Sequence, residues 1–412
     1  MKFFSDLNLD KKITKALEEI GFIEMTDVQA RAIPAALEGK DLVAQSITGS
    51  GKTAAFGVPI IEKLQHGHGI QSAIIGPTRE LVNQVSIEMQ KFSKHKRLEI
   101  ATVFGGVSME PQYQKLKHAD IVVGTPGRML DHMQRGTLRL NNVKILVLDE
   151  ADRMLDMGFI DDIRKIISQM PENRQTMLFS ATIPEEIMDI AKRFMKHPVK
   201  IMGEKHVSAH LLKHYYYDTN QEEKLSLLEY LIKKEKPHLA IVFCATRGVT
   251  DFVARELQRA GIEARAIHGG MGQDSRMRVL EGFHRGRPHI LVATDVAARG
   301  LDIKNVSHVF NYDIPKTAED YTHRIGRTAR FGKTGETISL LSKQDHEFFR
   351  KIIQYIEIEK KPLPEDFRPR KVFFKRERRF GSPPRFGGGG GPRRFGGPRH
   401  GDRRPRRRFE RR

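Results

Sequence analysis

Residues 41–53 read DLVAQSITGSGKT, and this stretch decides the predicted fold. A short apolar run, residues 41–44, leads into the glycine-rich segment 46–53, and a helix-compatible stretch follows. This order of strand, glycine-rich loop and helix is the context that a phosphate-binding loop requires. Its glycines let backbone N–H groups close around phosphates, Lys52 can neutralise them, and the Thr53 hydroxyl can reach Mg²⁺. The alternative is an ordinary glycine-rich turn.

The alternation of short apolar runs and helical patterns continues along the chain. The runs lie at 41–44, 73–76, 120–124, 144–149, 176–180, 239–244, 264–268, 289–294 and 308–312. Such alternation is typical of parallel sheets covered by helices. We therefore predict an α/β fold with two parallel-sheet domains. Only the first has a glycine-rich loop ending in Lys-Thr, so the second is not expected to hold a nucleotide by itself.

Changes in composition predict the domain boundaries. We expect a first domain over 1–201, a polar linker over 202–210 and a second domain over 211–369. Residues 370–412 are rich in Arg, Gly, Pro and interspersed Phe, and they offer too little aliphatic surface to offset the entropy of ordering. This last segment is predicted to be a disordered basic tail.

Charge is unevenly distributed over the 412 residues. The formal net charge is +20, of which residues 368–412 carry +15 and the remaining chain only +5. Such a tail seeks polyanions, so the composition indicates a nucleic-acid partner. The single cysteine, Cys244, excludes an internal disulfide and suits a reducing compartment. The N-terminal residues contain no continuous apolar stretch, so we expect neither a signal peptide nor a membrane span, and a cytoplasmic location.

An acidic quartet, Asp149-Glu150-Ala151-Asp152, stands 97 residues after Lys52. It follows the apolar run 144–148, so a buried strand presents its carboxylates at the sheet edge where ligands bind in open α/β folds. Asp149 is placed to hold Mg²⁺ through water, and Glu150 is the better candidate for deprotonating an attacking water. Asp152 is expected to couple the domains instead of acting in catalysis. Taken alone, the quartet is equally typical of an acidic helix start.

The second half carries closely spaced arginines within residues 321–330, YTHRIGRTAR. Two guanidinium groups three residues apart share one face if this segment is helical, and they repel each other. A partner anion such as the γ-phosphate would relieve the repulsion. The alternative is a solvated basic surface.

Polar turns follow several of the other apolar runs. They are Pro77-Thr78-Arg79-Glu80, Gly105-Gly106, Thr125-Pro126-Gly127-Arg128, His268-Gly269-Gly270 with Gln273 and Arg276, and the segment from Thr294 to Asp302. Each is expected in a loop at the same sheet edge, offering backbone N–H groups, hydroxyls and Arg to a phosphodiester chain. Each is also an ordinary turn when taken singly.

Together these segments resemble the DEAD-box RNA helicases, over residue 4 to about residue 341. Phe4, Gly21-Phe22 and Thr26 to Gln29 are similar to the adenine-recognition motif of that family. The departures are small. Ile47 occupies a variable loop position, and Ala329 stands where the family usually has Gly.

The resemblance implies two tandem RecA-like domains, with ATP and Mg²⁺ as cofactors. It implies nucleotide binding by Phe4, Phe22, Gln29, Thr48, Gly49, Ser50, Gly51, Lys52, Thr53 and Asp302, and metal binding by Thr53 and Asp149. It implies catalysis by Lys52, Asp149, Glu150 and the arginine fingers Arg327 and Arg330, and coupling through Asp152, Ser180, Thr182 and His323. Backbone-directed RNA contacts are implied for Pro77, Thr78, Arg79, Gly106, Thr125, Gly127, Arg128, Arg276 and Thr294.

The sequence thus predicts an ATP-dependent RNA helicase, a hydrolase whose RNA-stimulated turnover separates short duplexes or remodels RNA–protein complexes. RNA, as single strands and short duplexes, is the expected partner; ribosomal assembly or other ribonucleoprotein partners are compatible with it, and we expect a monomer. Two alternatives stay open. One is an ATP-gated RNA clamp or scaffold, and the other is a DNA translocase of a related group. The tail is expected to tether RNA, against a purely solubilising or self-associating role.

Overall fold

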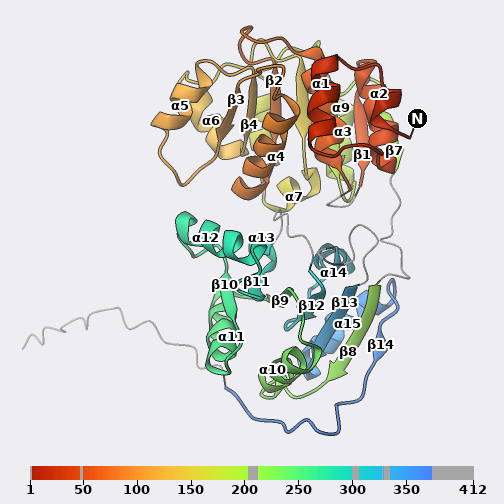
Figure 1. Ribbon diagram of the computed structural model, residues 1–412, viewed down its shortest axis with the longest axis vertical. Helices are drawn as coiled ribbons and strands as arrows, with labels where there is room; N and C mark the ends of the chain where they lie inside the picture. Colours follow the sequence, from red (N-terminus) through yellow and green to blue (C-terminus); the bar gives the residue numbers. More distant parts are fainter. Residues whose placement is uncertain are drawn as a thin grey trace, which may run out of the picture. The chain divides into compact units, whose positions relative to one another are not determined.

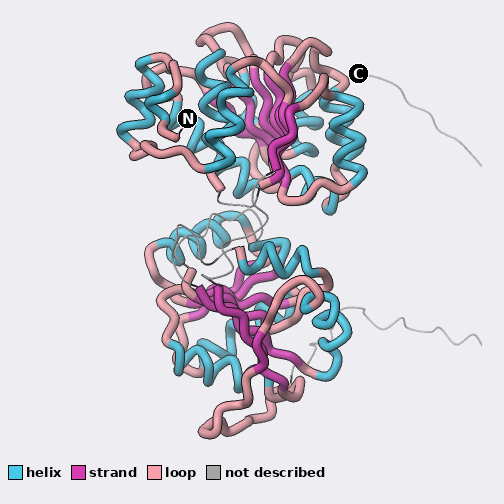
Figure 2. The backbone as a smooth tube through the Cα atoms, turned by 90° about the vertical axis from the view of Figure 1, so that its right-hand side faces the viewer, coloured by secondary structure: helices cyan, strands magenta, loops and turns pink. Residues whose placement is uncertain are grey.

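The computed structural model describes residues 2–46, 50–202, 212–298, 306–326, 328 and 335–373. Within these residues the chain forms two seven-stranded parallel sheets, one in each domain (Figure 1). In each domain helices cover the strands on both faces (Figure 2). The predicted α/β class with two parallel sheets is confirmed.

The first sheet has the order β3-β4-β2-β5-β6-β1-β7. Its strands are β1 (Leu42–Gln45), β2 (Ser72–Ile75), β3 (Ile100–Val103), β4 (Ile121–Gly124), β5 (Ile145–Leu148), β6 (Gln175–Ser180) and β7 (Val199–Met202). Its helices are η1 (Phe4–Asp6), α1 (Lys11–Glu19), α2 (Asp27–Leu37), α3 (Lys52–Lys63), α4 (Arg79–Phe92), α5 (Glu110–Leu116), α6 (Pro126–Gln134), α7 (Ala151–Asp156), α8 (Ile160–Ile167) and α9 (Glu185–Phe194).

Alternate residues of these strands serve two different cores. Leu42 and Ala44 of β1 pack with α1 to α4, whereas Val43 between them packs in the cluster of α5 to α9. Successive side chains of a strand point to opposite faces, so strands buried on both faces must be apolar throughout. This explains why the central strands read as continuous apolar runs.

The second sheet has the order β10-β11-β9-β12-β13-β8-β14. Its strands are β8 (Leu212–Asp218), β9 (Ala240–Cys244), β10 (Ala264–Ile267), β11 (Ile290–Thr294), β12 (His308–Asn311), β13 (Gly335–Leu341) and β14 (Glu359–Lys360). Its helices are α10 (Lys224–Glu235), α11 (Arg247–Arg259), α12 (Gln273–His284), α13 (Asp295–Ala298), α14 (Ala318–Ile325), η3 (Lys343–Asp345) and α15 (His346–Ile353). No helix in the described parts of the chain is both long and apolar enough to cross a membrane.

Two predicted boundaries shift. Met202, predicted to begin the linker, is the last residue of β7, and its carbonyl accepts a hydrogen bond of 2.7 Å from Arg31 Nη1. Arg370 and Val372, predicted to lie in the disordered tail, contact the second domain. Val372 N donates to Glu222 O (2.7 Å), and Arg370 N donates to Ser226 Oγ (3.1 Å). The other residues predicted for the linker, 203–210, and residues 374–412 of the tail lie outside the described residues.

A buried ion pair joins two helical segments of the second domain. Lys224, which is fully buried, donates from Nζ to Asp345 Oδ2 (2.7 Å) and to Tyr312 O (2.9 Å). Asp345 Oδ2 also accepts from the Ser342 backbone N–H at 2.8 Å. The pair therefore ties α10 to η3 and to the end of β12.

We expect Lys224→Met to lower the free energy of unfolding of the second domain by about 3–5 kcal/mol, because it leaves the Asp345 carboxylate buried without its cation. Tyrosine fluorescence during urea unfolding measures this, since all tyrosines except Tyr113 lie in the second domain. Lys233→Met is the matched control, because Lys233 forms an exposed pair with Glu229 on the same helix and should cost less than about 1 kcal/mol. Equal effects of the two substitutions would contradict the role of the buried pair.

Candidate active site

The order of the first sheet brings three loops together. Strands β5, β6 and β1 are consecutive neighbours and run parallel, so their carboxyl ends meet at one edge. Ser46 follows β1, Asp149 follows β5, and Ser180 ends β6. The sheet thus assembles at one edge residues that are far apart in the sequence.

Residues 50 and 51, at the end of the glycine-rich loop, lead directly into the first turn of α3. Gly51 has φ of 89°, a left-handed conformation that glycine adopts without strain, and Lys52 begins the helix. Lys52 is buried, and its Nζ donates to Ser46 O at 3.2 Å. Ser50 Oγ lies 3.2 Å from Ser46 Oγ, and Thr53 is half-buried on the same turn. Thr48 and Gly49 lie outside the described residues.

The Gln29 side chain is hydrogen-bonded to this loop. Its Nε2 donates to Gly51 O (3.0 Å) and its Oε1 accepts from Thr26 N (2.9 Å), while Thr26 Oγ1 donates to Ser50 O (2.8 Å). A Cβ at position 51 would meet the Gln29 amide, so a larger residue there would displace this side chain from its hydrogen bond with the loop. Phe4 is 4% exposed and meets Phe22 edge to face with ring centroids 5.6 Å apart, so its ring offers almost no free face in this structure.

Two adjacent carboxylates follow β5. Asp149 is 3% exposed, and burial raises its pKa to about 6, opposed by Lys52 and reinforced by Glu150. Its Oδ1 accepts from Glu150 N at 2.9 Å. Glu150 has φ of 50° and ψ of 52°, a left-handed conformation that is uncommon for a residue with a Cβ. The backbone therefore turns at Glu150, directly before the start of α7.

Arg153 is a site residue that the sequence analysis missed. Its Nη1 donates to Glu150 Oε2 at 3.0 Å, and the two side chains are 6% and 9% exposed. The three-residue spacing in a helix start was the available signal, because residues at that spacing share a helix face. The buried guanidinium holds the Glu150 carboxylate in a defined position.

Asp152 links α7 to the segment that follows β6. Its backbone N–H donates to Ser180 Oγ (3.0 Å), and its Oδ2 accepts from Ala181 N (3.0 Å), Thr182 N (2.9 Å) and Thr182 Oγ1 (3.2 Å). One carboxylate oxygen therefore receives three hydrogen bonds. The predicted coupling residues Asp152, Ser180 and Thr182 are in direct contact.

The predicted RNA contacts of the first domain gather at helix starts after β2 and β4. Thr78 is the N-cap of α4, where its Oγ1 accepts from Leu81 N at 3.4 Å, and Arg79 is the first helical residue after Pro77. The Arg79 guanidinium lies against Gly106, where any Cβ would clash with it. These residues were expected in loops, but Arg79 belongs to a helix because Thr78 caps it.

The residues after β4 were also expected in a loop, and they too lie at the start of a helix. Thr125 is the N-cap of α6, and Gly127 and Arg128 lie in its first turn behind Pro126. Arg128 donates from Nη1 and Nη2 to Val107 O at 3.1 and 3.2 Å. The N-termini of α4 and α6 thus lie among these residues, and the backbone N–H groups of a helix start favour anions.

In the second domain, Arg276 lies in the first turn of α12 and Thr294 ends β11. Arg276 Nη2 donates to Ala297 O at 2.9 Å. His323 lies on α14, which ends at Ile325. Asp302, Arg327 and Arg330 lie outside the described residues.

Arg324 of α14 is held by contacts within the second domain. It is 2% exposed and pairs with Asp295 through Nε (2.6 Å) and Nη2 (2.8 Å), while Nη1 donates to Asn311 Oδ1 (2.9 Å). A guanidinium satisfied on both edges is bound within its own domain. Arg324 is thus structural within the described residues.

Comparisons with known proteins agree with this geometry. The DEAD/DEAH box helicase model matches residues 26–190, and the helicase conserved C-terminal domain model matches residues 223–332. The ATP-dependent RNA helicase CshA of Listeria monocytogenes is 47% identical over 366 residues, which are 88% of this chain and 70% of that protein. This chain belongs to the DEAD-box RNA helicases.

Further members of the DEAD-box family support the assignment. The DEAD-box ATP-dependent RNA helicase CshA of Geobacillus kaustophilus is 47% identical over 349 residues, 84% of this chain and 74% of that protein. The structure of S. cerevisiae Dbp5 bound to RNA and ADP BeF3 matches with a TM-score of 0.80 and 32% identity, covering 88% of this chain and 96% of that chain. The two sheets are therefore the tandem RecA-like domains of a DEAD-box ATP-dependent RNA helicase.

We expect Asp149 to take up a proton near pH 6 in the nucleotide-free protein, because burial disfavours its charged form. Because the folded-state pKa lies above the ordinary 3.8, Asp149 favours the folded state most at low pH, where its carboxyl group is protonated. Its contribution to the free energy of unfolding falls as the pH rises from 3.8 towards 6. Carboxyl ¹³C chemical shifts of aspartate-labelled protein measure the titration. Asp149→Asn should remove the signal that titrates near pH 6; its persistence in that variant, or titration of every aspartate near 4, would contradict the burial argument.

Proposed function

We propose that this helicase hydrolyses ATP when RNA is bound and uses the cycle to separate short duplexes, or to remodel RNA–protein complexes, locally and without processive movement. One observation carries the proposal: Lys52, Asp149 and Glu150 converge at one sheet edge where Asp152 is bonded to Ser180 and Thr182. The matched Dbp5 structure, which is bound to RNA and ADP BeF3, supports the choice of ligands.

ATP would bind over the start of α3. Backbone N–H groups and Lys52 would receive its phosphates, with Thr48, Gly49, Ser50 and Gly51 forming the loop. Gln29, which contacts Gly51, would read the adenine edge, with Phe4 and Phe22 beside the base, and Asp302 would lie near the ribose. Because Phe4 is buried against Phe22, we infer that stacking on the base requires the segment before α1 to shift.

The donor set fits Mg²⁺. Asp149 and Thr53 offer hard oxygen ligands from the ends of β5 and α3, which Mg²⁺ prefers over nitrogen or sulfur. When bound, the ion would neutralise charge on the phosphates. Asp149 would hold it in the ionised form, so we expect weaker metal binding below pH about 6.

Glu150 would position and deprotonate the attacking water. It stands one residue beyond Asp149 and points differently because of its left-handed backbone, and Arg153 holds its carboxylate. A base fixed in this way needs no reorganisation at the moment of reaction. Arg327 and Arg330, from the second domain, would stabilise the charge that develops on the γ-phosphate.

RNA would be held by its sugar–phosphate backbone. The N-termini of α4 and α6, with Pro77, Thr78, Arg79, Gly106, Thr125, Gly127 and Arg128, supply donors in the first domain, and Arg276 and Thr294 supply them in the second. The Asp152 contact with Ser180 and Thr182, together with His323, would couple nucleotide state to RNA grip. The tail, through its Arg and Phe residues, would tether RNA without sequence preference.

We expect Glu150→Gln to keep ATP binding and to lower RNA-stimulated turnover by about 10²- to 10⁴-fold, because an amide cannot accept the proton of water. Phosphate release and fluorescent-nucleotide binding measure the two effects. Glu186→Gln, an exposed site on α9, is the control and should behave like the unsubstituted protein. Full turnover in Glu150→Gln would refute the base assignment; lost duplex separation with retained biological function would favour an ATP-gated clamp.

We expect Arg327→Ala to keep ATP affinity but to lose about 10³- to 10⁵-fold of RNA-stimulated turnover, the usual contribution of an arginine finger. Steady-state hydrolysis at saturating ATP and RNA measures the loss. Arg350→Ala removes an exposed guanidinium from α15 of the same domain and should leave turnover intact. An unchanged turnover number in Arg327→Ala would rule out the finger.

A further inference from the structure

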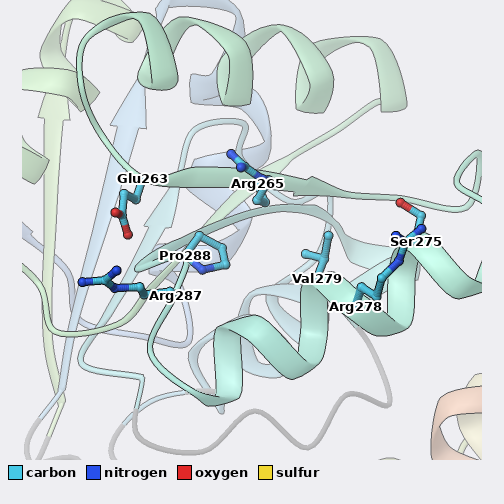
Figure 3. A pocket seen from close by; sticks show the side chains of 7 residues that line it. All are labelled: Glu263, Arg265, Ser275, Arg278, Val279, Arg287 and Pro288. Carbon is cyan, nitrogen blue, oxygen red and sulfur yellow. The ribbon is translucent and has the colours of Figure 1, made fainter.

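A basic groove lies on the second domain outside the residues assigned above. It has a volume of about 500 Å³ and runs between the edge strand β10 and helix α12 (Figure 3). It is lined by Glu263, Arg265, Ser275, Arg278, Val279, Arg287 and Pro288. The arginines come from β10, from α12 and from the turn before β11, so they are separate in sequence and meet only in the fold.

The hydrogen bonds of two groove arginines, Arg265 and Arg278, go to backbone carbonyls. Arg265 Nη1 donates to Ala264 O (3.1 Å) and Arg278 Nε donates to Asp274 O (3.3 Å), both backbone carbonyls. Over the residues that the structure describes, none of Arg265, Arg278 and Arg287 forms an ion pair with a carboxylate. Guanidinium groups gathered in one groove repel each other, and a bound anion removes that repulsion.

Glu263 is the one carboxylate among the described lining residues. Glu263 and Arg287 lie at one end of the groove, and Ser275 and Arg278 lie at the other, with Arg265 between them (Figure 3). Glu263 Oε2 lies 3.8 Å from His289 Nε2. The Glu263 carboxylate therefore lies at one end of the groove, and the described lining at the Ser275 and Arg278 end contains no carboxylate.

The groove continues from the predicted RNA-binding edge of the domain. Its Ser275 and Arg278 end belongs to the same helix whose first turn holds Arg276. The strand β10 forms one edge of the second sheet. An RNA strand that crosses the carboxyl ends of β11 and then β10 would therefore next meet the outer side of β10. An extended polyanion could therefore pass from Arg276 into the groove.

The lining favours phosphates over a protein segment. Val279 and Pro288 are the apolar members, and the lining contains no aromatic residue. Protein partners usually anchor through buried aromatic side chains, and the described lining of this groove offers none. Guanidinium groups bind phosphate oxygens in a bidentate manner without reading bases.

We propose that this groove binds the sugar–phosphate backbone of RNA that flanks the segment held by Arg276 and Thr294, and so extends the RNA footprint past the edge of the second sheet. The inference rests on the proposed RNA-binding function. It predicts that Arg265, Arg278 and Arg287 each contact a phosphate, independently of base sequence.

The test compares full-length protein with Arg265→Gln, Arg278→Gln and Arg287→Gln combined. RNA affinity is measured against salt with single strands of about 8 and about 20 nucleotides. Each lost phosphate contact on a single strand reduces the slope of log affinity against log salt by about 0.7, so the slope for the long RNA should fall by about 2. Affinity for the short RNA should stay unchanged.

The matched control combines Arg255→Gln, Arg259→Gln and Arg350→Gln, which remove the same charge from exposed positions elsewhere on the domain. The basic tail is common to all three proteins and cancels from the comparison. Equal salt slopes for the groove variant and the control would overturn the proposal. So would a groove variant that binds both RNAs normally but loses binding to a poly-glutamate peptide, which would assign the groove to an acidic protein segment.

Stimulation of ATP hydrolysis by the short RNA tests the proposed RNA-dependent activity separately from the groove. If the unsubstituted protein shows no stimulation of ATP hydrolysis by the short RNA, the proposed RNA-dependent activity fails, whatever the groove does. If stimulation by the short RNA is present and equal in all three proteins, the activity stands and the long-RNA slope alone decides the groove.

Discussion

The adjacency of β5, β6 and β1 in a parallel sheet is the constraint on which the site depends. Because the three strands run in one direction, their carboxyl ends deliver Lys52 with its loop, the two carboxylates after β5, and Ser180 with Thr182 to a single edge. Both faces of these strands are covered by helices, so the edge is the surface left for ligands. The position of the chemistry is thus a consequence of strand order.

That position has an energetic cost. Asp149 is buried beside Glu150, and desolvation with like charge disfavours its ionised form. Lys52 opposes this effect from one side, while Arg153 compensates Glu150 from the other. The Asp152 carboxylate is stabilised by hydrogen bonds instead of a cation, because one of its oxygens accepts from three donors. Binding of a cation or of phosphate groups would reduce the unfavourable electrostatic energy that remains among these buried charged groups.

The apolar runs of the sequence predicted nine of the fourteen described strands and missed β3, β7, β8, β13 and β14. Runs such as 144–148 are continuous because both faces are buried, whereas β7, with Lys200 exposed, and β8, with Tyr215 and Tyr216 half-buried, lack that signal. The strand β13 is mostly buried, but Thr337 and Ser339 interrupt its apolar pattern. The quartet and the loop were placed correctly, because each directly follows such a run. The burial of Phe4 against Phe22 and the internal binding of Arg324 could not be read from the sequence, because each depends on tertiary packing. The Glu150–Arg153 pair had a sequence signal in its three-residue spacing, but the spacing does not show that the pair is buried.

The central claim is that RNA controls the chemistry at the edge formed by β5, β6 and β1. Its most direct test is the rate of phosphate release from ATP by the unsubstituted protein, measured alone, with single-stranded RNA, and with DNA of the same sequence and length. We predict slow hydrolysis without nucleic acid, strong stimulation by RNA and little by DNA. Equal stimulation by DNA, or a rate indifferent to RNA, would contradict the account.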